Sequence, residues 1–292
     1  MTTETVMVAE PAVVAPRSPF MRTFKTVPVL LALFVLAVVV LVAVLAPWLT
    51  PYDPTAINPA MRLKGISAEH WLGTDAYGRD VFTRVLYGAR VSLLVGAGAA
   101  LLSVFLGLLI GVVAGYFRWV DAIAMRIMDG IMAIPGILLA IALVSLSGSS
   151  ITTVLIAITI PEIPRVVRLV RSVILSVRNE PYVEAAISLG TPTLRLMRIH
   201  LVPNTLAPLI VQGTYVFASA ILTEAILSFL GAGVPPSTSS WGNVMAEGRS
   251  FFQLIPGLVL YPGLLLSLTV LSVNILGDAL RDALDPRMAQ RL

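Results

Sequence analysis

Four stretches of the chain contain no charged residue and are each long enough to cross a membrane as a helix. They cover residues 27–49, 91–117, 201–223 and 250–277. A helix needs about 20 residues to cross a hydrocarbon core of about 30 Å. Hydrophobic residues make up 57% of the 292 and charged residues only 12%, against roughly 45–50% and 25% in soluble domains. Most of the surface must therefore face lipid, and the sequence predicts an all-α polytopic membrane protein.

A fifth apolar region, residues 130–160, is too long for one crossing. Its interruption, Ser147-Gly-Ser-Ser150, has the composition of a turn. We therefore expect two spans here, near 125–146 and 151–170. The total prediction is six transmembrane helices.

The distribution of basic residues predicts the orientation of these spans. With the N-terminus inside, the predicted cytoplasmic segments contain 14 of the 20 Lys and Arg residues and the external segments contain 6, which follows the positive-inside rule. Both termini are then cytoplasmic. The first span exceeds the 7–15 apolar residues or so of a cleaved signal peptide, so we expect it to remain as an anchor. The predicted organisation is a disordered cytoplasmic tail (1–26), a first transmembrane helix (27–50), an extracytoplasmic loop (51–88), a five-helix core (89–280) and a cytoplasmic tail (281–292).

The second span has a small residue at every fourth position. These residues are Ala99, Ser103, Gly107, Gly111 and Gly115. They form one stripe along a helix and allow a neighbouring backbone to approach closely. We expect a packing face here, with a partner that the sequence does not identify.

A polar interruption between the fourth and fifth spans predicts a helical hairpin outside the membrane. Arginines at positions 165, 168 and 171 indicate that the fourth helix continues as an amphipathic stem. Pro181 suits the first turn of a new helix, and Gly190 can end it in the left-handed conformation. Thr191-Pro192 then predicts the start of a second short helix over 194–201, which we expect to stop before Pro203.

The external side offers two features with alternative interpretations. The turn from Asp75 to Asp80 leads into an amphipathic segment, residues 81–86, which we expect to lie flat at the outer interface, either as an anchor or as a contact for a soluble delivery protein. Trp241 follows the fifth span among Pro, Ser and Gly residues. It indicates either a loop near a gate or an anchor in the interfacial aromatic belt, and we favour the anchor.

Two acidic residues, Asp129 and Glu224, lie within predicted spans. A charge at the centre of a membrane costs about 2.5–3.5 kcal/mol on insertion scales, so both are candidates for the substrate path. The alternative is structural pairing, with Arg126 as the nearest cation to Asp129. We expect Glu162 to form an ion pair with Arg165 or Arg168.

The sequence lacks the patterns that carry catalysis or ATP binding. It contains no Gly-x4-Gly-Lys motif, and its two lysines, Lys25 and Lys64, lie outside glycine-rich loops. His70 and His200 fall on opposite sides of the membrane in the predicted topology, and there is no cysteine. We therefore expect no enzyme activity in this chain alone, no metal site and no bound cofactor. We attribute the net charge of +4 to the excess of Lys and Arg in the cytoplasmic segments, and not to nucleic-acid binding.

Several motifs together resemble one family of transport proteins. Glu184-Ala185-Ala186 with Gly190 and Pro203 resembles the EAA loop of ATP-binding-cassette (ABC) importer permeases. Three further stretches, residues 70–80, 224–231 and 277–287, resemble the dipeptide and oligopeptide subgroup, and specifically its "C" permease. The resemblance covers about residues 28–287.

This resemblance implies a type I ABC importer permease fold in the plasma (inner) membrane of a bacterium. Its implied partners are a homologous permease, two ABC ATPase subunits or one fused ATPase that use ATP and Mg, an extracytoplasmic substrate-binding protein, and membrane lipid. The cytoplasmic coupling loop would cover 172–204. Its implied ATPase-coupling residues are Tyr182, Glu184, Ala185, Ala186, Leu189, Gly190, Arg195 and Pro203. The candidates for contact with the binding protein are Asp75, Arg79, Asp80 and Trp241.

Peptide is the cargo that this subgroup implies. Related permeases carry nickel complexes, glutathione or other small solutes, so these remain alternatives. An ion-coupled secondary transporter that uses Asp129 and Glu224 is a further, less favoured alternative.

Overall fold

The computed structural model describes residues 24–284, and nearly all of its regular structure is helical. The helices are α2 (Val27–Leu49), α3 (Val81–Tyr116), α4 (Arg118–Met132), α5 (Gly136–Ser147), α6 (Ile151–Val177), α7 (Pro181–Ser188), α8 (Thr193–Leu196), α9 (Val202–Phe229), α10 (Trp241–Gly248) and α11 (Gly257–Leu284). Two 3₁₀ turns, Pro59–Met61 and Arg249–Phe251, and a π-helix, Met197–Leu201, complete them. Of the predicted tails, residues 1–23 and 285–292 lie outside the described residues.

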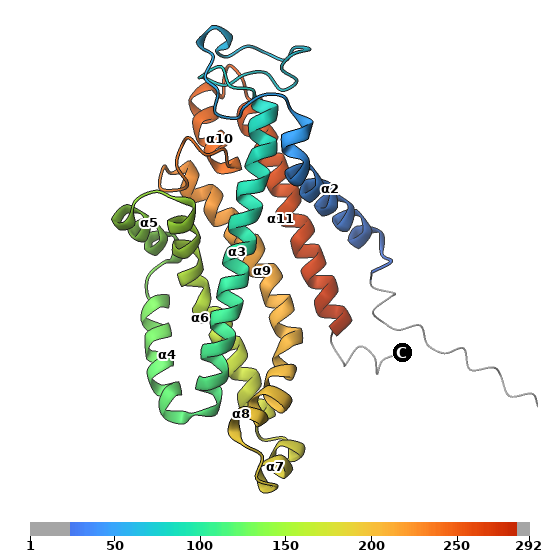
Figure 1. The fold of residues 1–292 in the computed structure, drawn as a ribbon, viewed down its shortest axis with the longest axis vertical. Helices are drawn as coiled ribbons and strands as arrows, with labels where there is room; N and C mark the ends of the chain where they lie inside the picture. The colour runs from blue at the N-terminus through green and yellow to red at the C-terminus, as the bar shows by residue number, and fades with distance from the viewer. Residues whose placement is uncertain (1–23, 285–292) are drawn as a thin grey trace, which may run out of the picture.

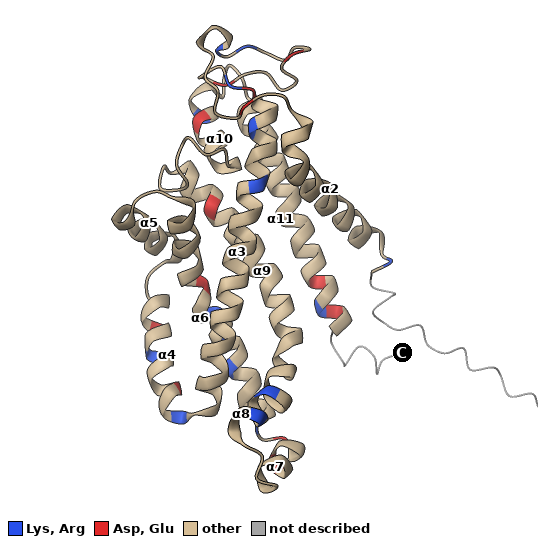
Figure 2. Cartoon of the chain, in the orientation of Figure 1, with Lys and Arg blue, Asp and Glu red and all other residues tan. Residues whose placement is uncertain are grey.

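The long helices run along the longest dimension of the molecule (Figure 1). The loop over 50–80 and α10 lie at one end, here named the α10 end. The short helices α7 and α8 project from the opposite end, named the α7 end. Figure 2 shows charged residues at both ends and also on α4, on the middle of α6 and on the last part of α11, whereas α2 and the middle of α3 and α9 contain none. The uncharged stretches of α2, α3 and α9 match lipid-facing or helix-packed segments.

Four helical segments of the described chain are long and apolar enough to cross a membrane: α2, α3, Thr193–Phe229 and α11. A fifth crossing results if α4 and α5, which meet at an angle of 86°, are one broken span. The predicted count of six is therefore not confirmed. Helix α6 has 27 residues, but Glu162 and Arg165, Arg168 and Arg171 make its second half polar.

The break between α4 and α5 corrects the prediction of one span over 125–146. It falls at Ala133 to Pro135, where Pro135 takes an extended conformation with φ −53° and ψ 126°. Proline has no N–H to donate, and it disfavours the helical conformation in the residue before it. The chain therefore ends α4 at Met132 and begins α5 in a new direction.

Helix α3 also differs from the prediction, because the amphipathic segment 81–86 is its first part rather than a separate interfacial helix. The Asp80 carboxylate caps the helix by accepting from the Thr83 N–H at 2.7 Å. No proline interrupts the 36 residues that follow. Val81 and Val85 are buried rather than facing a membrane surface.

The stripe of small residues on α3 packs as predicted, and its partner is α6. A Cβ atom added at Gly107 would lie 2.5 Å from the Val166 Cβ, and one at Gly115 would lie 2.7 Å from the Ile174 Cβ. Matching positions advance by four residues on both helices, so α3 and α6 run parallel in close contact. The β-branched side chains of α6 fill the space that the glycines leave open.

Substituting Gly111 by alanine tests this contact. The new Cβ would lie 2.7 Å from the Val170 Cβ and 3.0 Å from the Val167 carbonyl oxygen. We expect a loss of about 1–3 kcal/mol of stability, as overpacking of a tight interface typically costs. Thermal unfolding in detergent measures it, with Gly130→Ala on α4 as the control, because nothing lies within 4 Å of that position. Equal melting temperatures for the two variants contradict the expectation.

Ion pairs attach α4 to α6 near the α7 end. Arg168 binds Asp129 with 2.6 Å between Nη2 and Oδ1, and Arg171 binds both carboxylate oxygens of Asp121. Asp129 therefore pairs with Arg168 rather than with the expected Arg126. The predicted pairing of Glu162 with Arg165 is confirmed at 3.1 Å.

Candidate coupling site

The hairpin over residues 181–203 lies at the α7 end (Figure 1). Its first helix, α7, begins at Pro181 and ends at Ser188, with Glu184 in its first turn. Pro181 was predicted in the first helical turn because its missing N–H has no helical partner there in any case. An acidic residue near the N-terminus is favoured by the helix dipole.

Gly190 makes the sharp turn of the hairpin, as predicted. Its φ of +75° is in the left-handed region. The Gly190 N–H donates to the Ile187 carbonyl at 2.9 Å, and the Thr191 N–H donates to the Ala186 carbonyl at 3.1 Å. This pair of bonds is a Schellman motif, which satisfies the last carbonyls of α7 and reverses the chain.

The second half of the hairpin corrects the prediction of a short helix that stops before Pro203. Helix α8 passes directly into the π-helix Met197–Leu201 and then into α9. Pro203 lies in the first turn of α9, where the ordinary α pattern would bring its ring against the carbonyl of residue 199. The π-helix Met197–Leu201 directly precedes this turn, so the backbone here departs from the ordinary α pattern. The hairpin is therefore continuous with a membrane-length helix.

The inner side of the hairpin packs on the helix bundle. Val183 of α7 and Leu196 and Leu201 of the second half are buried in one cluster with Val170 and Ile174 of α6. The Tyr182 and His200 rings are in contact in a tilted arrangement, with centroids 6.0 Å apart, and the Asn204 side chain donates to the Tyr182 hydroxyl at 3.2 Å. Both arms of the hairpin are thus fixed to α6 and α9.

The outer side of the hairpin exposes an apolar patch that consists of Ile187, Leu189, Leu194 and Ile199. Leu189 is 87% exposed and Leu194 70% exposed. Several large exposed apolar side chains on one short hairpin are typical of a surface that binds a protein partner. Glu184 is exposed beside this patch. The sequence prediction included Leu189 but missed the other three, since their exposure depends on which face of each short helix packs inward.

The other predicted coupling residues divide between the two sides of the hairpin. Tyr182, Ala185, Gly190 and Arg195 are exposed, whereas Ala186 is buried against the bundle. Pro203 is exposed on the first turn of α9, away from the tip.

At the α10 end, four charged side chains form a cluster, in which Asp75, Arg79 and Arg84 are buried and Glu247 is partly exposed. Arg84 donates to Asp75 at 2.7 Å and to Glu247 at 2.6 Å, and Arg79 donates to Asp75 at 2.7 Å. Arg79 also binds Glu247. Two cations and two anions thus join the 50–80 loop, α3 and α10. Sequence analysis assigned no role to Arg84 or Glu247, because these two residues are 163 positions apart in the chain.

The residues predicted to contact a binding protein are all buried in this structure. Asp80 caps α3, and its other carboxylate oxygen lies 2.8 Å from His70 Nδ1, from which it accepts a hydrogen bond in the tautomer that carries hydrogen on Nδ1. Trp241 is fully buried, and its indole N–H donates to the Val85 carbonyl at 3.1 Å. The favoured prediction that Trp241 anchors the membrane interface is therefore wrong. Asp75 and Arg79 belong to the ion-pair cluster, so these four side chains hold the α10 end together.

The two candidates for the substrate path occupy different environments. Glu224 is completely buried and accepts from the Ser92 and Ser228 hydroxyls at 3.1 and 2.8 Å. Asp129 is half exposed and paired with Arg168. Among the described residues, no group of three or more His, Asp and Glu side chains is arranged to hold a metal ion.

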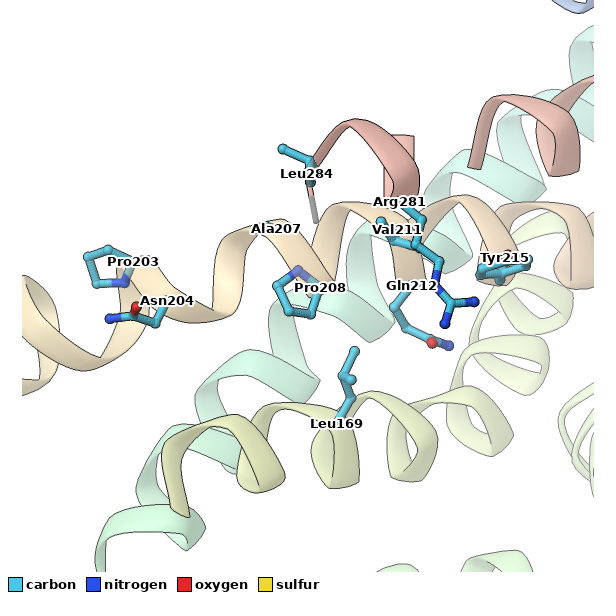
Figure 3. A pocket seen from close by; sticks show the side chains of 10 residues that line it. All are labelled: Leu169, Pro203, Asn204, Ala207, Pro208, Val211, Gln212, Tyr215, Arg281 and Leu284. Carbon is cyan, nitrogen blue, oxygen red and sulfur yellow. The ribbon is translucent and has the colours of Figure 1, made fainter. Parts of the chain in front are cut away.

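A pocket of about 680 Å³ lies between α6, α9 and the end of α11, next to the hairpin (Figure 3). It is lined by Leu169, Pro203, Asn204, Ala207, Pro208, Val211, Gln212, Tyr215, Arg281 and Leu284. Neither Asp129 nor Glu224 lines it.

Comparison with protein families determines the class of this membrane protein. Residues 103–290 match the family described as binding-protein-dependent transport system inner membrane component. The chain belongs to this family. Residues 20–65 of the permease also match the N-terminal transmembrane domain of oligopeptide transport permease C. The all-α membrane fold expected from the sequence is thereby shown, and such a component works with other subunits of a transport system.

Individual relatives are similar over most of the permease. A probable peptide ABC transporter permease protein of Sinorhizobium fredii is 53% identical over 86% of each chain. A dipeptide transport system permease protein of Alkalihalophilus pseudofirmus is 45% identical over 93% of this chain and 91% of the relative. A glutathione transport system permease protein of Pectobacterium atrosepticum is 40% identical over 97% of this chain and 95% of the relative.

Proposed function

We propose that this permease forms part of the translocation pathway of an ATP-driven importer for dipeptides and oligopeptides, together with a homologous permease. The hairpin is the observation that carries this proposal. It combines an exposed apolar patch with an inner side packed on α6 and α9. The names of the relatives with 53% and 45% identity support peptide as cargo.

In this proposal the hairpin is the docking site for a cytoplasmic ATPase. A groove on the partner can hold an amphipathic helix on both sides and move it as a rigid unit. Since α7 and α8 share one apolar cluster with α6 and α9, movement of the hairpin also moves these long helices. Alternating access by rocking of helix bundles is a general transporter solution. ATP and Mg bind to the partner, because this chain contains no phosphate-binding motif.

The α7 end is then cytoplasmic, with both termini on that side, and the α10 end faces outward from the bacterial inner membrane. A substrate-binding protein would meet exposed side chains of the 50–80 loop. Ile57, Ile66, Trp71 and Tyr77 of this loop are all at least half exposed. These residues replace the buried Asp75, Arg79, Asp80 and Trp241 as the proposed contacts.

Glutathione is the alternative cargo with a specific observation in its favour, since one relative with 40% identity carries that name. Glutathione is itself a small peptide with free carboxylates, so both cargoes need similar chemistry. An ion-coupled secondary transporter is less favoured, because the Asp129 side chain is paired and that of Glu224 is enclosed by hydroxyls.

Uptake by the reconstituted complex tests the proposal. We expect labelled dipeptide to accumulate in proteoliposomes that contain this permease, its partner permease, the ATPases and the binding protein, and only with ATP. The control complex contains an ATPase that binds but does not hydrolyse ATP. Uptake that proceeds equally without ATP, or accumulation of another solute but of no peptide, contradicts the proposal.

A further inference from the structure

The pocket at the α7 end has a polar corner and an apolar wall. Gln212 and Tyr215 of α9 and Arg281 of α11 contribute the polar corner. Leu169 of α6 and Pro208 and Val211 of α9 contribute to the wall. Figure 3 shows the Arg281 guanidinium and the Gln212 amide extending into the space between α9, α11 and Leu169 of α6. The volume of about 680 Å³ falls within the roughly 300–1,000 Å³ of pockets that bind small molecules.

The lining of the pocket carries a positive charge and no negative charge. Arg281 is cationic, and no lining residue carries a carboxylate. The nearby Asp278 accepts a hydrogen bond from the Tyr215 hydroxyl, and that hydroxyl also accepts a hydrogen bond from Arg281. Within residues 24–284, no carboxylate forms an ion pair with Arg281. The polar corner is thus suited to an anionic group.

We infer that this pocket is a cargo-binding site in which Arg281 binds the C-terminal carboxylate of a transported peptide. This inference rests on the proposed function and assigns a chemical feature of the cargo to particular residues. A guanidinium can bind a carboxylate through two parallel hydrogen bonds. The Gln212 amide supplies a further donor, and the apolar wall accommodates peptide side chains without selecting among them.

A phospholipid phosphate is the competing source of an anion, because Arg281 lies in the last turn of α11 and arginine side chains near helix ends extend to headgroups. The amide group of Gln212 favours the peptide, since it can pair with the peptide backbone as well as with its carboxylate. Lipid occupancy gives a different result in the first experiment below.

The first experiment uses the absence of cysteine from this chain. Val211→Cys introduces a single thiol into the apolar wall, in a complex with cysteine-free partners. We expect 10 mM of a free dipeptide to slow maleimide labelling in inside-out vesicles at least about threefold, and its C-terminally amidated form to slow it much less. Val113→Cys, on the exposed face of α3, is the control that neither peptide protects. Labelling that is unaffected by peptide, or blocked until lipid is removed, overturns the inference.

The second experiment measures transport. Arg281→Gln is expected to lower the uptake of free-carboxylate dipeptide about tenfold, as expected for loss of a charge-assisted hydrogen bond. Arg118→Gln, an exposed arginine of α4 outside the pocket, is the matched control. Uptake by Arg281→Gln equal to that of the control overturns the inference while leaving the proposed function intact. Failure of the unmodified complex to import any peptide contradicts the proposed function instead.

Discussion

The Glu184→Lys variant is expected to lose ATP-dependent uptake and to retain the ATPase poorly during purification. Glu184 is exposed on α7 beside the apolar patch, and it forms no ion pair within the described chain. Its negative charge is therefore available to a partner protein. Removing one member of a desolvated charge pair at an interface costs about 2 kcal/mol or more, so we expect retention to fall by at least about tenfold.

Two measurements separate this effect from unfolding. Detergent should extract the variant with the same yield as the unmodified permease, and both should elute at the same volume, since an exposed side chain contributes little to the fold. Glu69→Lys reverses an exposed charge at the α10 end and should retain the ATPase normally. If Glu184→Lys and Glu69→Lys behave alike, the hairpin is not the docking site.

The Arg84→Met variant is expected to show the largest loss of stability among single substitutions at the α10 end. Arg84 is almost completely buried and donates to both Asp75 and Glu247. Methionine of similar length leaves two carboxylates to share the one remaining guanidinium of Arg79. Breaking a buried ion pair in this way costs about 3–5 kcal/mol. Thermal unfolding in detergent provides the measurement.

Arg90→Met is the matched control for this prediction. Arg90 lies on the same helix, is exposed, and contacts only the Tyr87 ring among the interactions described for it, with 5.6 Å from Cζ to the ring centroid. We expect little change in its melting temperature, as is usual for surface substitutions. A melting temperature of Arg84→Met within one degree or so of the control contradicts the assignment of the cluster as a structural connection.

The regular parts of the fold were predictable because they depend on local patterns. Charge-free runs locate the long helices, and the spacing of Gly107, Gly111 and Gly115 identifies the face of α3 that packs. The break at Pro135 was missed because the apolar run continues across it. In such a run, hydropathy carries no information about direction, and the proline was the only signal of a bend.

The site was predictable only in part, for a similar reason. Proline and glycine at positions 181 and 190 determine the backbone of the hairpin, so its turn was found. Which side chains point outward depends on tertiary packing, so Leu194 and Ile199 were missed. The partners of Arg84 are 9 and 163 residues away in sequence. The burial of Trp241 likewise depends on contact with α3, and its surrounding residues gave no indication of it.

Cross-linking from the tip of the hairpin tests the docking of the ATPase most directly. Leu189→Cys places a single thiol at the most exposed position of the apolar patch, in a chain that otherwise contains no cysteine. A short thiol-to-amine cross-linker, applied to the assembled complex in native membranes, is predicted to join this permease to the ATPase. Leu146→Cys, equally exposed on α5, should give no such product. Cross-linking from Leu146→Cys alone, or from neither position, contradicts the account.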